Sequence, residues 1–556
     1  MRDEIAIFCE NTGTTQVVKK GTELSDLAHI MGIKLNSRLI GAKVNYITRP
    51  LNHICFHPCK VRYMDISDPS AMRIYVRSLC FVLFVAIKKR LPEANLRIEH
   101  PISKGYFCSL GLDREIEAHE IDAVREEMAK LIAANLPIEF FEDTAENVIA
   151  LFRERGGYDE TIDLIQTSGK LNSYYYMLDG EIYFFDGILV PSTGYIDTFD
   201  IVRFYDGLLL RVPNPDKPAE LDDLVEQPAM FAAFDKQIEF QKILGLSNVG
   251  QLNKVIRKGR ISDLVVVAEA LQEKNIARIA DEIAERYKNG VRIVLVSGPS
   301  SSGKTTFTKR LQIQLVINYL KPLAISLDDY FVNRERTPLD ENGEYDFESL
   351  HALDLPYLNS DLEALLRGDE VELPRFIFET GEREKSGHKI RLEKGSILIL
   401  EGIHALNPGL TGMIPDSAKY KAYVSALTTI SLDDHNWVPT TDNRLIRRII
   451  RDHNYRGHSV AATIARWRSV RNGEDKWIFP YQENADATFN SAMLYELAAL
   501  RYNAERILME VLPNQPEYGE AVRLMKFLSY FNYLNESELP RTSLLREFLG
   551  GSSFLY

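Results

Sequence analysis

The residues best suited to bind phosphate stand near the middle of the chain. Residues 291–306 read VRIVLVSGPSSSGKTT, an apolar β-branched run that ends at Gly298 and is soon followed by a Gly-Lys-Thr triplet. Glycines let a loop fold tightly, so that backbone N–H groups and the next helix N-terminus point at phosphate oxygens. The stretch predicts a strand, a phosphate loop and a helix over 307–320, with an ordinary Gly/Ser-rich turn as the alternative. The expected phosphate-contacting residues are Gly298, Ser300, Ser302, Gly303, Lys304, Thr305 and Thr306.

Two acidic positions follow the ends of two later apolar runs. Residues 323–327 are followed by Asp328, and residues 396–400 by Glu401. In a parallel sheet built from βα units, the carboxyl ends of the strands share one edge, where phosphates bind. A carboxylate there can orient and deprotonate an acceptor hydroxyl, and another can hold Mg²⁺. A helix N-cap is the alternative for either acid. We expect Asp328 and Lys304 to be catalytic and Thr305, Asp328 and Glu401 to bind Mg²⁺.

Arginines are concentrated downstream of these acids. Four of them are spaced three or four residues apart within 442–456, namely Arg444, Arg447, Arg448 and Arg451. A second group, Arg466, Arg468, Arg471 and Lys476, falls on a predicted helical lid. Arginines on a mobile lid can neutralise the charge on a transferring phosphoryl group, whereas a solvated basic helix is the alternative.

Length and composition set limits on the whole chain. Its 556 residues exceed what one core organises, so about three or four domains are expected. A net charge of -13 argues against bulk electrostatic binding to nucleic acid or anionic membranes. The start resembles no signal peptide, and the longest apolar stretch, residues 79–87, is too short to span a bilayer. All five cysteines lie in the first fifth without a disulfide pattern. We expect a cytoplasmic protein without membrane contact.

Residues 1–62 predict a small α+β unit. The pattern indicates strands at 5–9 and 15–18, a helix at 24–31 and a strand at 41–46. With GTELSDLA before the helix and IGAKVN after it, the unit resembles the TGS domain, a ubiquitin-like module of threonyl-tRNA synthetases and some regulatory GTPases.

Near the end of this unit, four potential metal ligands occur at every second position. In HICFHPC they are His53, Cys55, His57 and Cys59. A zinc site is one interpretation, but ligands along a strand form a line rather than a tetrahedron, and Pro58 interrupts the strand. A strand-to-loop junction is therefore favoured.

Residues 63–215 form a second predicted unit. A helix at 77–92 is followed by EHPI and the strand-like KGYFCSL. This stretch resembles the second additional domain of threonyl- and alanyl-tRNA synthetases, which removes a wrong amino acid from tRNA. Its metal-binding positions are occupied here by Arg77, Phe81, Phe185 and Leu189, while Thr193 and Gly194 persist. The resemblance implies the domain's shape without its hydrolytic chemistry.

Residues 216–288 predict a charged helical connector, in which isoleucines recur three and four residues apart. Its basic stretch, 254–260, is interpreted as a solvated helix face rather than an RNA site.

A third resemblance covers residues 290–515. GPSSSGKTT, SLDDYF, YDFE, LEGIHAL and LIRRIIRDHNYRG occur in the order seen in uridine kinases and the wider uridine kinase/phosphoribulokinase family. The resemblance implies an acceptor site of Phe331, Phe347, Glu348, Phe376, Arg448 and Arg451, with Arg451 also catalytic. Several positions depart from the family pattern: Glu348 replaces Asp, Gly381 a base-contacting His, His458 an Arg, and Phe376 and Phe378 two tyrosines. Gly381 leaves room for other bases.

Together these features predict a multidomain α/β and α+β protein. The expected units are a TGS-like domain (1–62), a synthetase-like domain (63–215), a helical connector (216–288), a P-loop kinase domain with a parallel sheet (289–515) and a C-terminal tail (516–556). The expected activity is ATP- and Mg²⁺-dependent phosphorylation of a nucleoside 5′-hydroxyl, of uridine and also cytidine, in pyrimidine salvage. The alternatives are an RNA- or ribosome-associated nucleotide-binding regulator, a kinase of another small hydroxyl acceptor, and an editing hydrolase, against which the lost ligands argue. RNA contact through the N-terminal domains and self-association stay open.

Overall fold

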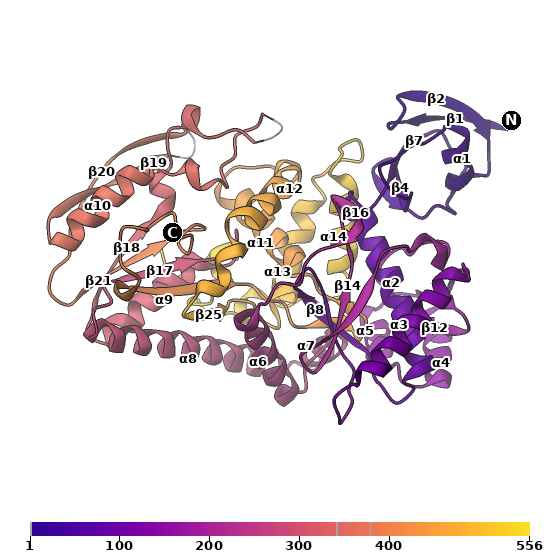
Figure 1. The fold of residues 1–556 in the computed structure, drawn as a ribbon, viewed down its shortest axis with the longest axis horizontal. Coiled ribbons are helices and arrows are strands. Elements are labelled where there is room, and N and C mark those ends of the chain that lie inside the picture. The colour runs from indigo at the N-terminus through magenta and orange to yellow at the C-terminus, as the bar shows by residue number, and fades with distance from the viewer. Residues whose placement is uncertain (1–2, 341–342, 378–379, 556) are drawn as a thin grey trace.

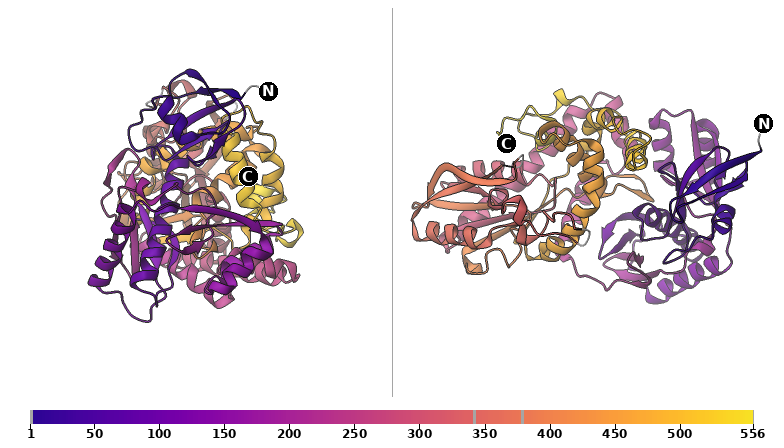
Figure 2. Two further views of the ribbon diagram at one scale, coloured as in Figure 1. Left: turned by 90° about the vertical axis from the view of Figure 1, so that its right-hand side faces the viewer. Right: turned by 90° about the horizontal axis from the view of Figure 1, so that it is seen from above.

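The structure, a computed structural model, describes residues 3–340, 343–377 and 380–555. The molecule is elongated, with the N-terminal unit at one end and the kinase-like sheet at the other (Figure 1). The chain's C-terminal end returns to the side of the kinase-like sheet. It lies far from the N-terminus, as Figure 1 and the right-hand view of Figure 2 show.

The N-terminal unit is a twisted sheet with one helix packed on it. In β1 (Glu4–Cys9), every second side chain is buried, which is the pattern of a strand with one face on a core. The sheet order is β2-β1-β7-β4-β5, and β3 pairs separately with β6. The other elements are β2 (Thr14–Lys19), β3 (Thr22–Glu23), α1 (Leu24–Ile30), β4 (Gly41–Val44), β5 (Ile47–Arg49), β6 (Ile54–Cys55) and β7 (Cys59–Met64).

The alternating His/Cys row does not form one strand. Cys55 ends β6, Cys59 begins β7, and His57 lies exposed between them. Within residues 3–340, 343–377 and 380–555, no group of three or more His, Cys, Asp or Glu side chains is arranged to hold a metal ion.

The synthetase-like unit packs two antiparallel sheets around one apolar helix, α2 (Pro69–Arg90). This helix begins at Pro69, earlier than the predicted Arg77, because Asp68 caps its N-terminus through the Ser70 amide and proline suits the first turn. By length and composition alone α2 could cross a membrane, but 78% of its most apolar window is buried inside the protein. It therefore has the burial of a core helix.

The remaining elements of this unit surround α2. The sheets have the orders β13-β14-β9-β8 and β10-β11-β12. The bounds are β8 (Arg97–Ile102), β9 (Gly105–Ser109), α3 (Ala118–Ala133), β10 (Glu139–Thr144), α4 (Ala145–Arg155), α5 (Asp159–Ser168), β11 (Asn172–Leu178), β12 (Glu181–Tyr183), β13 (Asp200–Phe204) and β14 (Gly207–Arg211).

The connector is helical only after its first residues. Residues 217–221, predicted as part of a helical stretch, instead form β16 (Lys217–Leu221), which pairs with β15 (Pro213–Asn214). Helices α6 (Pro228–Leu244), α7 (Val249–Arg257) and α8 (Ile261–Lys288) follow. The basic stretch is partly docked, since Lys254 forms an ion pair with Asp163 and Arg257 donates to the Thr167 carbonyl.

The kinase-like core is a five-stranded parallel sheet with the order β18-β21-β17-β22-β25. All five residues of β17 are buried, as an apolar run covered on both faces requires. The strands are β17 (Ile293–Ser297), β18 (Lys321–Ser326), β21 (Ser396–Glu401), β22 (Lys419–Ser425) and β25 (Ala487–Asn490). The predicted strands at 291–296, 323–327 and 396–400 thus correspond to β17, β18 and β21.

Helices and hairpins cover this sheet and extend from it. Helix α9 (Lys304–Ile317) follows the phosphate loop directly and begins before the predicted 307. The others are α10 (Leu355–Arg367), β19 (Glu370–Ile377), β20 (Glu382–Arg391), β23 (Ser431–Asp433), β24 (Asn436–Trp437), α11 (Thr440–Tyr455), α12 (Val460–Trp477), α13 (Glu496–Leu508), α14 (Tyr518–Leu528) and α15 (Arg546–Leu549). The C-terminal tail is part of the main core, because Leu544, Leu545 and Phe548 are fully buried in it.

Candidate active site

The phosphate loop joins β17 to α9, and two glycines set its shape. Gly298 has φ +156°, and a Cβ there would lie 1.9 Å from the Val424 carbonyl oxygen, so only glycine fits. Gly303, at φ +84°, is the N-cap of α9. The Lys304 ammonium donates to the Pro299 carbonyl at 3.1 Å. Burial lowers the pKa of Lys304, and the charges of Glu401 and Asp328 oppose that shift.

Three arginines of α11 hold this loop. Arg444 donates from Nε to the Ser300 carbonyl at 3.0 Å, and Arg447 donates from Nη1 to the Ser301 carbonyl at 3.3 Å. Both are fully buried and paired, Arg444 with Glu474 and Arg447 with Glu496. These two arginines therefore support the loop backbone rather than face an open site. Arg448 differs from these two, because its Nη1 donates to the side-chain hydroxyl of Ser300 at 2.7 Å. The Arg448 guanidinium also interacts electrostatically with Glu348.

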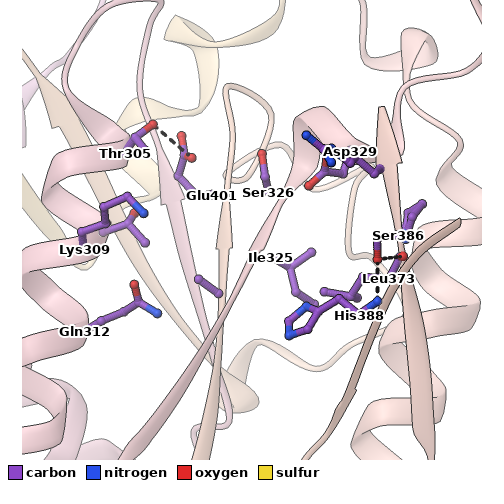
Figure 3. A pocket seen from close by; sticks show the side chains of 14 residues that line it. Thr305, Lys309, Gln312, Ile325, Ser326, Asp329, Leu373, Ser386, His388 and Glu401 are labelled. Atoms are coloured by element: carbon purple, nitrogen blue, oxygen red, sulfur yellow. Dashed lines mark hydrogen bonds between the residues drawn. The ribbon is translucent and has the colours of Figure 1, made fainter. Parts of the chain in front are cut away.

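The strand register brings the predicted acids to the phosphate loop. Glu401 pairs with Val296 on one side and with Ser326 on the other, so it stands between the loop and the segment that carries Asp328. The Thr305 hydroxyl donates to Glu401 Oε2 at 3.4 Å (Figure 3). The pKa of Glu401 is raised to about 7, chiefly by burial; the charge of Lys304 opposes this shift and that of Asp328 adds to it. A hydroxyl and two carboxylates are the oxygen donors that Mg²⁺ prefers.

The neighbouring acids Asp328 and Asp329 diverge. Asp328 interacts electrostatically with both Lys304 and Glu401. Asp329 instead accepts from the Phe376 amide at 3.3 Å, and with Thr305 and Glu401 it lines a cavity of about 350 Å³. In Figure 3, Asp329 lies across this cavity from Thr305 and Lys309 on α9. The structure therefore distinguishes the two carboxylates, which the sequence DD alone could not.

Aromatic and acidic side chains form the expected acceptor side. The rings of Phe331 and Phe376 are 5.6 Å apart, and that of Phe347 lies 5.9 Å from Tyr345. Burial raises the pKa of Glu348 to about 7, while the charge of Arg448 opposes the shift. Helix α12 closes over Glu348, since a Cβ on Gly473 would lie 2.3 Å from the Glu348 Cβ. Phe378 lies outside the described residues.

Two expectations about this side need correction or refinement. Gly381 does not leave open space, because a Cβ there would lie 2.7 Å from Arg334 Nε, and the Arg334 amide donates to the Gly381 carbonyl. Arg451 is held by its neighbour, donating to Asp452 Oδ1 at 2.7 and 2.9 Å. His458 is exposed just beyond α11.

The predicted lid cations separate into two groups on α12. Arg471 donates to Glu474 Oε2 at 2.8 Å and lies beside the phosphate loop. Arg466, Arg468 and Lys476 are exposed, as the solvated-helix alternative predicts.

Two glutamates that sequence reasoning missed contact the phosphate loop. Glu474 accepts from the Ser300 amide at 3.1 Å. Glu547, from the C-terminal helix α15, accepts from the Thr306 amide at 3.2 Å and from the Thr306 hydroxyl at 2.6 Å. Neither glutamate belongs to a motif, and both approach the loop from distant segments. Only the three-dimensional structure could identify them.

The synthetase-like unit has no comparable polar cluster at the former metal positions. The rings of Phe81 and Phe185 are 5.2 Å apart, and Leu189 is buried beside them. The fourth position, Arg77, lies against Gly187, where a Cβ would meet the guanidinium at 2.5 Å. These side chains provide no ligands for zinc.

The β23–β24 hairpin of the kinase-like region packs into the same place. His435 stacks on Tyr183 with ring centroids 3.9 Å apart, and burial lowers the pKa of His435 to about 3. Asn436 accepts from the Asp186 amide at 2.8 Å and donates to the Phe184 carbonyl at 3.0 Å. The positions that correspond to the metal site of the resembled domain thus lie at an interface with the kinase-like region.

Comparisons with known proteins give two separate similarities. Residues 293–497 match the model of the Phosphoribulokinase / Uridine kinase family. The uridine kinase of Lactobacillus helveticus is 28% identical over 196 residues, which are 35% of this chain and 83% of that protein. The uridine kinase of Schizosaccharomyces pombe is 30% identical over 215 residues, 36% of this chain and 41% of that protein. A threonine–tRNA ligase of Natranaerobius thermophilus is 29% identical over 144 residues, 26% of this chain and 23% of that protein.

These findings confirm the predicted resemblances to uridine kinases and to threonyl-tRNA synthetases. The C-terminal region has a parallel sheet and is similar to kinases, and the N-terminal region is similar to threonine–tRNA ligases. The chain spans less than half the length of the ligases and of the Schizosaccharomyces pombe kinase.

Proposed function

We propose that the protein is an ATP- and Mg²⁺-dependent nucleoside kinase that phosphorylates the 5′-hydroxyl of uridine, and of cytidine as a second acceptor. One observation carries the proposal: Lys304, the Thr305–Glu401 pair and Asp328 meet at one edge of a parallel sheet. This is the arrangement that phosphoryl transfer to a hydroxyl requires.

Each residue has a separate task. Lys304 and the loop amides would bind the nucleotide phosphates, and Arg448 and Arg451 would face the charge that develops during transfer. Thr305, Asp328 and Glu401 would hold Mg²⁺, which when bound neutralises phosphate charge. Asp328 would orient the acceptor hydroxyl and take its proton. Most of the rate enhancement then comes from positioning and fixed charge.

The acceptor side favours a ribonucleoside. Phe347 offers an aromatic face to a base, and the Glu348 carboxylate can accept hydrogen bonds from ribose hydroxyls. A sugar phosphate would not need this pair. Removing one ribose hydroxyl would leave the buried carboxylate without its partner, so the site should reject 2′-deoxy analogues strongly.

The test is ADP formation with a panel of acceptors, with each product identified by mass. We expect turnover with uridine and cytidine and at least about a hundredfold lower kcat/KM with deoxyuridine. Purine ribonucleosides belong in the panel, and Arg334 beside Gly381 predicts that they react poorly. Activity with ribulose 5-phosphate but with no nucleoside would overturn the acceptor assignment. Nucleotide binding without any acceptor-dependent ADP formation would favour the alternative function, that of an RNA- or ribosome-associated nucleotide-binding regulator.

A further inference from the structure

The C-terminal segment 543–550 lies directly on the phosphate loop and the first turn of α9. The loop and this segment are separated by more than two hundred residues in sequence, yet the Glu547 carboxylate accepts from both the amide and the hydroxyl of Thr306. The chain's C-terminal end lies beside the kinase-like sheet in Figure 1 and in the right-hand view of Figure 2.

The group that Glu547 engages is a phosphate-binding group. Thr306 is in the first turn of α9, where backbone N–H groups have no partner within the helix and favour an anion. The Glu547 charge also acts on Lys304, opposing the lowering of the lysine pKa, and on Glu401, whose pKa it raises. Glu547 therefore lies among the groups expected to bind the nucleotide phosphates.

A second carboxylate occupies the other side of the same loop. Glu474 accepts from the Ser300 amide and is itself held by Arg444 and Arg471. Two loop donors thus contact carboxylates of the protein itself. A nucleotide phosphate on the same donors would have to displace these carboxylates, because like charges at hydrogen-bond distance repel.

Apolar contacts anchor the segment there. A Cβ on Gly303 would lie 2.7 Å from Leu544, so this side chain packs against the loop's last glycine. Phe548 lies under the Arg447 guanidinium, 5.1 Å from ring centroid to carbon, and is fully buried. The segment also contacts the end of α11, where Asn454 donates from its side-chain Nδ2 to the Phe548 carbonyl at 3.5 Å.

We propose that residues 543–550 are an autoinhibitory plug of the nucleotide site, in which the Glu547 carboxylate takes the place of a phosphate oxygen. Nucleotide binding displaces the plug, so the affinity for nucleotide is reduced by the energy of docking the segment. This regulation rests on the proposed kinase function, because it concerns the same phosphate loop. The opposing explanation is that Glu547 is a permanent cap of α9 that nucleotide never displaces.

The test measures nucleotide binding rather than phosphoryl transfer. Full-length wild type, Glu547→Gln and Glu547→Ala are titrated with Mg²⁺-ADP by calorimetry, after their thermal unfolding has been compared. Removing a charge-assisted hydrogen bond from the plug should tighten ADP binding by about tenfold. Glu538→Gln is the matched control, since Glu538 lies in the same tail but bonds only to Ser262 at the surface. Its ADP affinity should equal that of wild type.

Hydrogen exchange provides the second measurement. Amides of 543–550 should lose protection when saturating Mg²⁺-ADP binds wild type, while those of α14 should not. Unchanged or weaker ADP binding by both Glu547 variants, with the segment still protected, would establish the cap and overturn the plug. If Glu547 variants bind ADP more tightly but no acceptor is phosphorylated, the plug stands and the proposed kinase function fails.

Discussion

The strand-end cluster of the kinase-like region and the positions of the synthetase-like region that correspond to a metal site in the resembled domain differ in what they bury. At the first, Lys304, Glu401 and Glu348 lie close together although burial opposes the charge of each one. At the second, the buried side chains are apolar, namely Phe81, Phe185 and Leu189. Perturbed charges cluster where chemistry requires them, while a site without its ligands becomes ordinary core.

This difference predicts which mutations change activity and which change stability. Groups in the strand-end cluster should control turnover with little effect on folding. Groups in the filled site should control folding with little effect on turnover.

The largest expected effect comes from Asp328→Asn. An amide cannot take the acceptor proton, so kcat should fall by about 10²–10⁴-fold, while ADP affinity measured without Mg²⁺ and thermal stability stay near wild type. Steady-state kinetics with uridine and calorimetric ADP titration measure the two quantities. Asp329→Asn is the matched control, because the Asp329 carboxylate already accepts a hydrogen bond from the Phe376 amide. A larger loss of kcat in the control would transfer the catalytic role to Asp329.

The next effect should be on stability, from Phe185→Ala. Phe185 is fully buried between Phe81 and Tyr183, so its removal should lower the free energy of unfolding by about 3–5 kcal/mol. The kcat of the folded fraction should stay unchanged. Urea unfolding and kinase assays at low temperature separate the two. Phe140→Ala, at a ring that is 51% exposed, should destabilise much less. A loss of kcat without loss of stability would contradict the comparison.

How far the sequence predicted this molecule depends on how local each signal was. The strands β17, β18 and β21, the phosphate loop and Glu401 were predictable, because apolar runs and glycine spacing are local and the parallel edge follows from βα alternation. The start of α2 at Pro69 was missed, although Asp68-Pro69 is a recognisable cap, because the helix was predicted from its apolar part alone.

Other features depended on contacts between distant segments. Glu474 and Glu547 reach the phosphate loop only after the lid and tail fold back, and no spacing in the sequence encodes that. The structural role of Arg444 and Arg447 was hidden for the same reason, since their buried partners lie on α12 and α13. The space beside Gly381 was misjudged because Arg334 fills it from another loop.

A smaller effect is expected from pH at the strand-end cluster. The Glu401 carboxyl has a pKa of about 7 and must lose its proton to bind Mg²⁺. Lowering the pH from 8 to 6 should therefore weaken Mg²⁺-dependent nucleotide binding by about tenfold. Titrations in matched buffers measure this, and Glu401→Gln should abolish the dependence. Glu348→Gln should keep it, because Glu348 has a similar pKa but belongs to the acceptor side. A flat profile in wild type would remove Glu401 from the metal set.

The last prediction is that the synthetase-like region has no hydrolytic activity, and it tests the second of the two regions compared. The synthetase-like region should neither bind stoichiometric zinc nor hydrolyse mischarged tRNA, because Phe81, Phe185 and Leu189 cannot coordinate a metal and Arg77 repels one. The β23–β24 hairpin also packs here, with His435 against Tyr183 and Phe185. Full-length protein carrying Lys304→Ala, which removes the kinase activity, should be incubated with mischarged tRNA and with zinc. The rate of deacylation should equal that without protein, and metal analysis should find far less than one zinc per chain. Rapid hydrolysis with bound zinc would show that the filled site can open. The two regions would then differ in conformation rather than in the side chains that they contain.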